Sequence, residues 1–279
     1  MDDNWIIECL SWTFEFWNEK QTEIWELVST TPQEFKGGDI WTLALTINDG
    51  LKAIGYGLLV LFFAVSICKS TVNFRDISRP EQGLRFFIRF VLAKTAVTYG
   101  IDIMTAIFNI CGGIVSSIAG NMGTIATSVS LPEELTKAIG EVGFLASIPL
   151  WLVTILGCLV IIVLSSVMIL VVYARFFKLY IYTAFSPIPL SSFAGETTSF
   201  MGKAFMKSYT GVCLEGAVIV LACLIFSAFT SSGDIGLADP DSTAVVQVLA
   251  YLVEVIFNML VLVGLVKGAD RIVKEMLSL

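Results

Sequence analysis

The chain has 279 residues, of which 56% are hydrophobic and 15% charged, and its mean hydropathy is +0.83. These values exclude an ordinary soluble domain, in which about half of the residues are apolar and about a quarter charged. The formal net charge of −7 gives no sign of a nucleic-acid surface, and the chain has no histidine, the residue that most often shuttles protons and binds metals. The six cysteines are scattered without metal-ligand or disulfide spacing.

Residues 1–44 are predicted to form a separate, extracytoplasmic amphipathic segment ahead of a transmembrane bundle over residues 45–279. Polar side chains recur every three or four positions from Glu8 to Glu26, with most apolar side chains on the opposite face. Five of the six tryptophans lie in this segment: Trp5, Trp12, Trp17, Trp25 and Trp41. Because indole rings favour the membrane–water boundary, the pattern predicts an interfacial helix. Two interpretations remain open, a docking surface for a partner and a packing cap on the bundle.

Five long apolar stretches are predicted to cross the lipid bilayer as helices. The stretch 148–172 contains 25 residues without a charged side chain. At about 1.5 Å per residue it exceeds the ~30 Å hydrocarbon core of a bilayer. The predicted spans are 44–68, 86–110, 148–172, 209–229 and 245–266. The expected fold class is therefore an all-α integral membrane protein with five transmembrane helices.

The apolar stretch 179–194, between the third and fourth spans, contains Pro187 and Pro189. Proline lacks a backbone N–H and clashes with the preceding helical turn. We therefore expect a broken re-entrant or interfacial segment on the cytoplasmic side, with its backbone satisfied by protein or water.

The distribution of basic residues predicts the orientation of the chain. Segments 69–89, 175–207 and 267–274 carry 12 of the 17 lysines and arginines, whereas 1–49, 119–147 and 230–244 carry three. By the positive-inside rule, the N-terminus lies outside and the C-terminus in the cytoplasm of a multi-pass cell-membrane protein.

The charged residues singled out within the predicted spans are Lys94, Asp102, Glu215 and Glu254. Charge is costly in the membrane and is often functional there. Lys94 and Asp102 are separated by ~12 Å of helix rise and cannot pair, whereas Lys94 and Glu215 lie at similar depth and could meet across helices. These groups are interpreted either as a polar conduit or subunit seam, or as structural pairs buried in the bundle.

A stripe of small residues follows the second span, with Gly112, Ser116 and Gly120 spaced four apart. Small residues at this spacing let membrane helices approach closely. The stripe is therefore predicted to be a helix-packing surface.

No catalytic, cofactor-binding or metal-binding motif is apparent in the sequence, so a non-enzymatic protein without cofactors is expected. A stand-alone transporter or pore for a small solute is the alternative. Such folds usually have broken helices in matching positions of two repeats, whereas here the broken segment has no counterpart and five spans do not divide into halves.

Three stretches carry a resemblance to a known family: RFFKLY at 175–180, SPIPLSSFAGE at 186–196 and SYTGVCLEGAVIVLAC at 208–223. The chain resembles the TrbL-type polytopic subunit of conjugative type IV secretion systems, the equivalent of the sixth VirB component, in its Gram-positive mobile-element branch. The detailed similarity covers about residues 170–225, and the five-span layout covers the whole chain.

The resemblance implies a channel or scaffold subunit that helps to pass a DNA–relaxase substrate across the cytoplasmic membrane. It also implies a homo-oligomer, contacts with pilin-like, scaffold and ATPase subunits, and transient contact with the translocating single-stranded DNA. Relatives often have a large extracytoplasmic central domain, which the short connection between the second and third spans does not provide.

Overall fold

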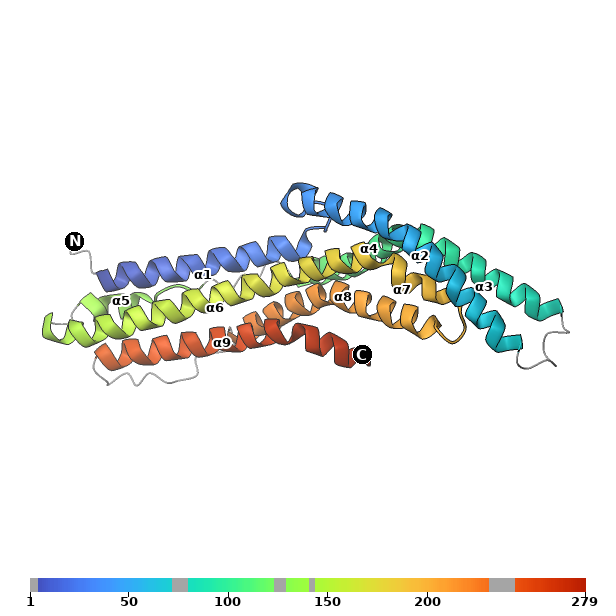
Figure 1. The fold of residues 1–279 in the computed structure, drawn as a ribbon. Coiled ribbons are helices and arrows are strands. Elements are labelled where there is room, and N and C mark those ends of the chain that lie inside the picture. The colour runs from blue at the N-terminus through green and yellow to red at the C-terminus, as the bar shows by residue number, and fades with distance from the viewer. Residues whose placement is uncertain (1–4, 72–79, 123–128, 141–143, 231–243) are drawn as a thin grey trace. The chain divides into compact units, whose positions relative to one another are not determined.

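The computed structural model describes residues 5–71, 80–122, 129–140, 144–230 and 244–279, and all the regular structure in these ranges is helical. The α-helices are α1 (Trp5–Ser29), α2 (Asp39–Thr71), α3 (Pro80–Thr98), α4 (Gly100–Met122), α5 (Glu133–Gly140), α6 (Phe144–Phe185), α7 (Pro187–Ser191), α8 (Ser199–Thr230) and α9 (Ala244–Met276). Two short 3₁₀ helices, η1 (Phe35–Gly38) and η2 (Ser192–Ala194), precede α2 and follow α7. The all-α fold class is therefore confirmed (Figure 1).

Five helices of the described chain are long and apolar enough to cross a membrane, as predicted. The candidate spans are Phe35–Lys69, Gly100–Ile118, Leu150–Phe185, Ser199–Phe229 and Val245–Met276. Three of them contain the predicted spans 44–68, 209–229 and 245–266, and Leu150–Phe185 covers all but the first two residues of 148–172. The longest helix, α6, has 42 residues, so it extends well beyond the length that a ~30 Å hydrocarbon core requires.

The second span differs from the prediction. The predicted helix 86–110 is divided between α3 and α4 at Tyr99, and the candidate span begins only at Gly100. Backbone hydrogen bonds continue through the junction, from Tyr99 N–H to Thr95 O (2.9 Å) and from Ile103 N–H to Tyr99 O (3.0 Å). A Cβ at Gly100 would lie 2.8 Å from Cδ1 of Leu190. Glycine thus lets the start of α4 approach Leu190, a tertiary contact that hydropathy does not reveal.

The chain forms two compact units whose segments alternate along the sequence. The first contains residues 1–29, 116–173 and 218–269, and the second contains residues 30–115, 174–217 and 270–279. Helices α4, α6, α8 and α9 contribute to both units.

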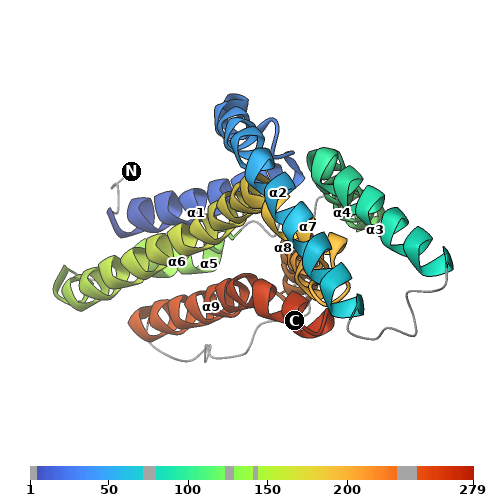
Figure 2. The same cartoon turned by 45° about the vertical axis from the view of Figure 1, so that its right-hand side comes forward.

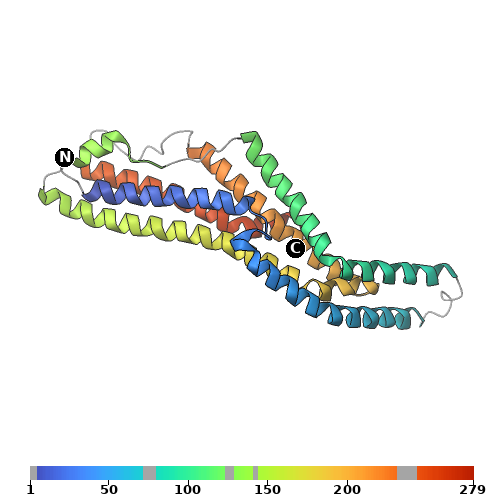
Figure 3. The same cartoon turned by 90° about the horizontal axis from the view of Figure 1, so that it is seen from above.

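In the first unit, α1 lies alongside the first half of α6 (Figures 1 and 3). The rings of Trp5 and Trp151 are 5.6 Å apart, and the sulfur atoms of Cys9 and Cys158 are 3.4 Å apart. The predicted amphipathic helix therefore forms, and it packs lengthwise on the first half of α6. The arrangement agrees with the packing-cap interpretation, and Trp17 is buried in it.

In the second unit, α7 and η2 pack between the antiparallel helices α2 and α3 (Figures 2 and 3). Their shared apolar core consists of Leu59, Ala93, Val97, Leu190 and Ala194. A Cβ at Gly55 of α2 would lie 2.9 Å from the carbonyl oxygen of Pro187, so a glycine is needed for this close approach.

The predicted break between α6 and α8 occurs at Ser186, later than the sequence suggested. Residues 179–185 continue α6 as a regular helix, which corrects the prediction for that part of 179–194. Pro187 begins α7, a position where proline's missing N–H removes no helical hydrogen bond. Asn48 of α2 donates from Nδ2 to Thr183 O (2.7 Å) and to Ser186 Oγ (2.9 Å). Thr183 O also accepts from Ser186 Oγ (3.0 Å), so the amide of Asn48 joins α2 to a hydrogen-bonded end of α6.

Oxidation with copper–phenanthroline is expected to join Cys9 to Cys158, because their sulfur atoms need to approach only from 3.4 Å to about 2.0 Å. Mass spectrometry of a non-reduced digest would detect the linked peptides of α1 and α6. The Cys9→Ser variant, treated in the same way, should leave Cys158 free. A wild-type protein that gives no such linked peptide would contradict the packing of α1 on α6.

Candidate functional site

The most unusual side chain of the second unit is Arg175, a guanidinium only 2% exposed in the contact between α6 and α8. Its Nε donates to Val212 O and its Nη2 to Cys213 O, both at 3.3 Å. Carbonyls inside a helix can accept these bonds because each oxygen has a second lone pair. The guanidinium carbon also lies 5.8 Å from the centroid of the Phe108 ring, within the range of a cation–π contact.

Gly216 of α8 provides the space that Arg175 occupies. A Cβ at Gly216 would lie 2.5 Å from Nη1 of Arg175, closer than any real Cβ contact. Nη1 has no hydrogen-bond partner among the described residues. The buried cation is therefore held on two sides by backbone carbonyls and a ring, and glycine is required opposite its remaining nitrogen.

A chain of ion pairs begins one helical turn after Arg175. Lys178 Nζ lies 3.3 Å from Glu215 of α8 and 3.4 Å from Asp270 of α9, and Asp270 pairs with Lys274 at 2.8 Å. The Glu215 side chain is 2% exposed, and burying an unpaired carboxylate costs desolvation free energy. The neighbouring ammonium of Lys178 offsets part of that cost. The network therefore ties the second half of α6 to α8 and to the end of α9.

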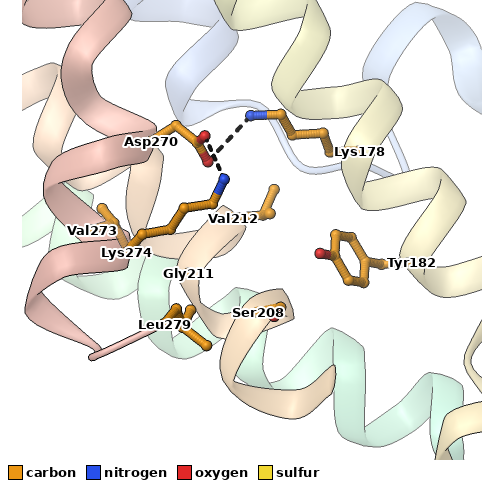
Figure 4. Close-up of a pocket in the computed structure, with 9 residues that line it drawn as sticks. All are labelled: Lys178, Tyr182, Ser208, Gly211, Val212, Asp270, Val273, Lys274 and Leu279. Carbon is orange, nitrogen blue, oxygen red and sulfur yellow. Dashed lines mark hydrogen bonds and ion pairs between the residues drawn. The ribbon is translucent and has the colours of Figure 1, made fainter. Parts of the chain in front are cut away.

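These helices surround a pocket of about 460 Å³, shown in Figure 4. Lys178 and Lys274 both point toward Asp270 on one side of it. The remaining lining residues are Tyr182, Ser208, Gly211, Val212, Val273 and Leu279. The pocket thus combines ion-paired groups and hydroxyls with an apolar wall.

The predicted intramembrane charges lie in different surroundings. Glu215 is buried, but its partner is Lys178, so the suggested pairing with Lys94 does not form. Lys94 lies in α3 and Asp102 in the first turn of α4, and both are exposed on the isolated chain. Glu254 is buried in α9, in the first unit. Glu215 therefore forms a buried ion pair within the chain, which was one of the two interpretations of the intramembrane charges.

The predicted small-residue stripe of α4 is open in its described part. No atom lies within 4 Å of a Cβ built on Gly112, and Ser116 is exposed. Gly120 belongs to the same helix, but its surroundings lie outside the described side chains. Within this part of the chain, no helix occupies the stripe.

The outer face of α1 has the features expected of a docking surface, one of the two interpretations of the N-terminal segment. Glu8 and Glu15 are exposed, and Trp12, 56% exposed, stacks on Phe16 with ring centroids 5.8 Å apart. Trp5 is also exposed, whereas Trp25 is half-buried. On the same helix the pKa of Lys20 is raised, chiefly by its hydrogen bond to Glu23. This face is therefore acidic and aromatic at once.

Sequence reasoning missed the central residues of the site. Arg175 and Lys178 were interpreted as charges beyond the end of a span, whereas the structure places them within α6. Glu215 was singled out, but with Lys94 as its suggested partner; Gly216 appeared only within the resemblance, and Asp270 was not singled out. The spacing of Asp270 and Lys274, four residues apart on a helix, was a usable signal for an ion pair.

The site holds no arrangement typical of a metal centre. Among the described residues, no three His, Cys, Asp or Glu side chains cluster as metal ligands. The interactions present are ion pairs, backbone hydrogen bonds and ring contacts between helices, and their evident effect is to hold α6, α8 and α9 together.

Comparison with known proteins gives one match. The family model described as "TrbL/VirB6 plasmid conjugal transfer like protein" matches residues 17–187, more than half of the chain. The match includes α2, α3, α4 and α6, and ends at the start of α7, so it overlaps the stretch 170–225 only in part. No protein of curated function and no solved structure matches the chain significantly.

The Gly216→Ala variant is expected to lose about 1–3 kcal/mol of stability, since the new methyl group would displace the buried guanidinium. Thermal unfolding in detergent, followed by circular dichroism, would measure the loss as a lowered Tm. Gly57→Ala is the matched control, a glycine of α2 with nothing within 4 Å of its Cβ. Equal Tm values for the two variants would show that Arg175 does not need the space.

Proposed function

The chain belongs to the TrbL/VirB6-like family of plasmid conjugal transfer proteins, and from that premise we propose that it is a channel or scaffold subunit of a conjugative type IV secretion machine in the cytoplasmic membrane. The observation that carries the proposal is the family match over residues 17–187 in a chain with five candidate membrane spans. In this role the protein is non-enzymatic, and ATPases among its partner subunits supply the energy for transfer.

The distribution of paired and exposed charges supports a role in assembly. Arg175 and Glu215 are buried in contacts within the chain, whereas Lys94, Asp102 and the described part of the Gly112 stripe remain open. Charged groups and small residues on apolar helices are suited to contacts with other membrane helices. We assign these open surfaces to contacts with further copies of the chain and with other secretion subunits, including pilin-like and scaffold components.

The acidic aromatic face of α1 is the second surface that fits such contacts. Tryptophan is enriched in protein interfaces, and Trp12 is exposed on this face. The neighbouring carboxylates of Glu8 and Glu15 would orient a basic partner. Under the positive-inside rule, the N-terminus is extracytoplasmic and the C-terminus cytoplasmic. The face of α1 would then meet components on the outer side, and the translocating single-stranded DNA–protein substrate would meet this subunit only transiently.

Deletion of the gene from its mobile element should abolish conjugative transfer without slowing growth of the donor, because the channel would lack a membrane subunit. Mating frequency on selective plates measures the effect, and expression of the intact gene in trans should restore transfer. A deletion strain that mates at the wild-type frequency would refute this function. A growth defect with normal mating would instead support a stand-alone solute transporter.

The orientation can be tested with single cysteines in a cysteine-free protein. A membrane-impermeant maleimide should label the Asp3→Cys variant in intact cells, but should label Ser278→Cys only after the cytoplasmic membrane is opened. The expectation follows from the excess of lysine and arginine in 69–89, 175–207 and 267–274. Labelling of both positions in intact cells would overturn the topology.

A further inference from the structure

We propose that the pocket between α6, α8 and α9 binds the phosphate group of an anionic phospholipid. The inference goes beyond the role in conjugation and does not depend on it, because it rests on the groups that line this pocket (Figure 4). Three features support it: cations with donors to spare, hydroxyls without protein partners, and an apolar wall.

The two lysines of the pocket can bind a phosphate oxygen without giving up their ion pairs. Lys178 contacts Glu215 and Asp270, and Lys274 contacts Asp270 alone. An ammonium group carries three donors, so Lys178 keeps one donor and Lys274 keeps two. The Lys274 side chain is also 56% exposed, which leaves its ammonium accessible from the pocket.

The charge balance around the pocket favours one additional negative charge. The ion pairs join two cations, Lys178 and Lys274, to two carboxylates, Glu215 and Asp270, and a third cation, Arg175, lies one turn earlier on α6. Arg175 donates only to backbone carbonyls, so no carboxylate of the network neutralises it directly. A phosphodiester carries a single negative charge and would balance this third cation.

Two hydroxyl groups face the same space. Tyr182 and Ser208 line the pocket, and neither hydroxyl forms a hydrogen bond to another described residue. Both can donate to phosphate oxygens, and hydrogen bonds to a charged group are stronger than those between neutral groups.

The apolar wall points to a lipid as the source of the phosphate. Val212, Val273 and Leu279 border the site, and it lies between helices of a membrane protein. A soluble phosphate gains nothing from such a wall, whereas the glycerol and first acyl carbons of a phospholipid would bury apolar surface against it. Basic pockets between transmembrane helices are known binding sites for anionic lipid head groups.

Native mass spectrometry of the full chain in a neutral detergent would test the site by titration with phosphatidylglycerol and with phosphatidylcholine. Wild type should bind one phosphatidylglycerol in preference to phosphatidylcholine. The Lys274→Gln variant should weaken phosphatidylglycerol binding about fivefold, the contribution expected of one lysine near an anionic lipid. Lys203→Gln, which removes the same charge from α8 at a position that does not line the pocket, should leave the affinity unchanged.

Equal affinity for the two lipids, or equal effects of the two lysine variants, would overturn the proposal. The Tyr182→Phe and Ser208→Ala variants, which keep every ion pair, provide a second measure and should weaken phosphatidylglycerol binding without lowering Tm. Glycerol phosphate distinguishes a lipid from a soluble phosphate. Weak competition at millimolar concentration supports the lipid, whereas displacement at the concentration of the lipid itself would refute it as the source.

Discussion

The arrangement of the second unit depends on the burial of one guanidinium between two long helices. The guanidinium of Arg175 donates to the backbone carbonyls of Val212 and Cys213 and lies over the ring of Phe108. Gly216 leaves space for it, because it has no side chain. A buried charge without such partners would cost several kcal/mol. The same contact sets the register of α6 on α8, which places Lys178 beside Glu215 and within reach of α9.

A second constraint comes from the chain break after α6. Two prolines follow the end of the long helix, and Asn48 of α2 donates from its amide to Thr183 O and Ser186 Oγ at this end. The short helix α7 then fills the space between α2 and α3, where Gly55 allows close backbone contact. Buried polar residues such as Asn48 and Glu215 therefore bond to backbone groups or to charged side chains, which lowers the cost of burying them.

The predictable parts of this protein are those that hydrophobicity and helix period control. Apolar stretches such as 148–172 and 245–266 fell within long helices, and the polar–apolar alternation of α1 matched its buried and exposed faces. The division of the second span at Tyr99 was not foreseen, and neither was the close approach of Gly100 to Leu190 beside it, because hydropathy carries no information on tertiary contacts. The lengthwise packing of α1 on α6 was equally hidden, since amphipathicity identifies a face but not its partner.

By itself, the sequence determined that this is an all-helical membrane protein with five long apolar helices, because a lipid solvent requires apolar side chains and internally bonded backbone along each span. Particular stretches of the sequence also carried the resemblance to conjugal transfer subunits. Only the tertiary structure decided which charges are buried and what pairs with them: Glu215 with Lys178 instead of Lys94, and Arg175 with the backbone of α8. Such pairings depend on the rotation and register of helices far apart in sequence. Distances of 3 to 4 Å between their side chains follow from packing, which residue type and spacing within one helix do not encode.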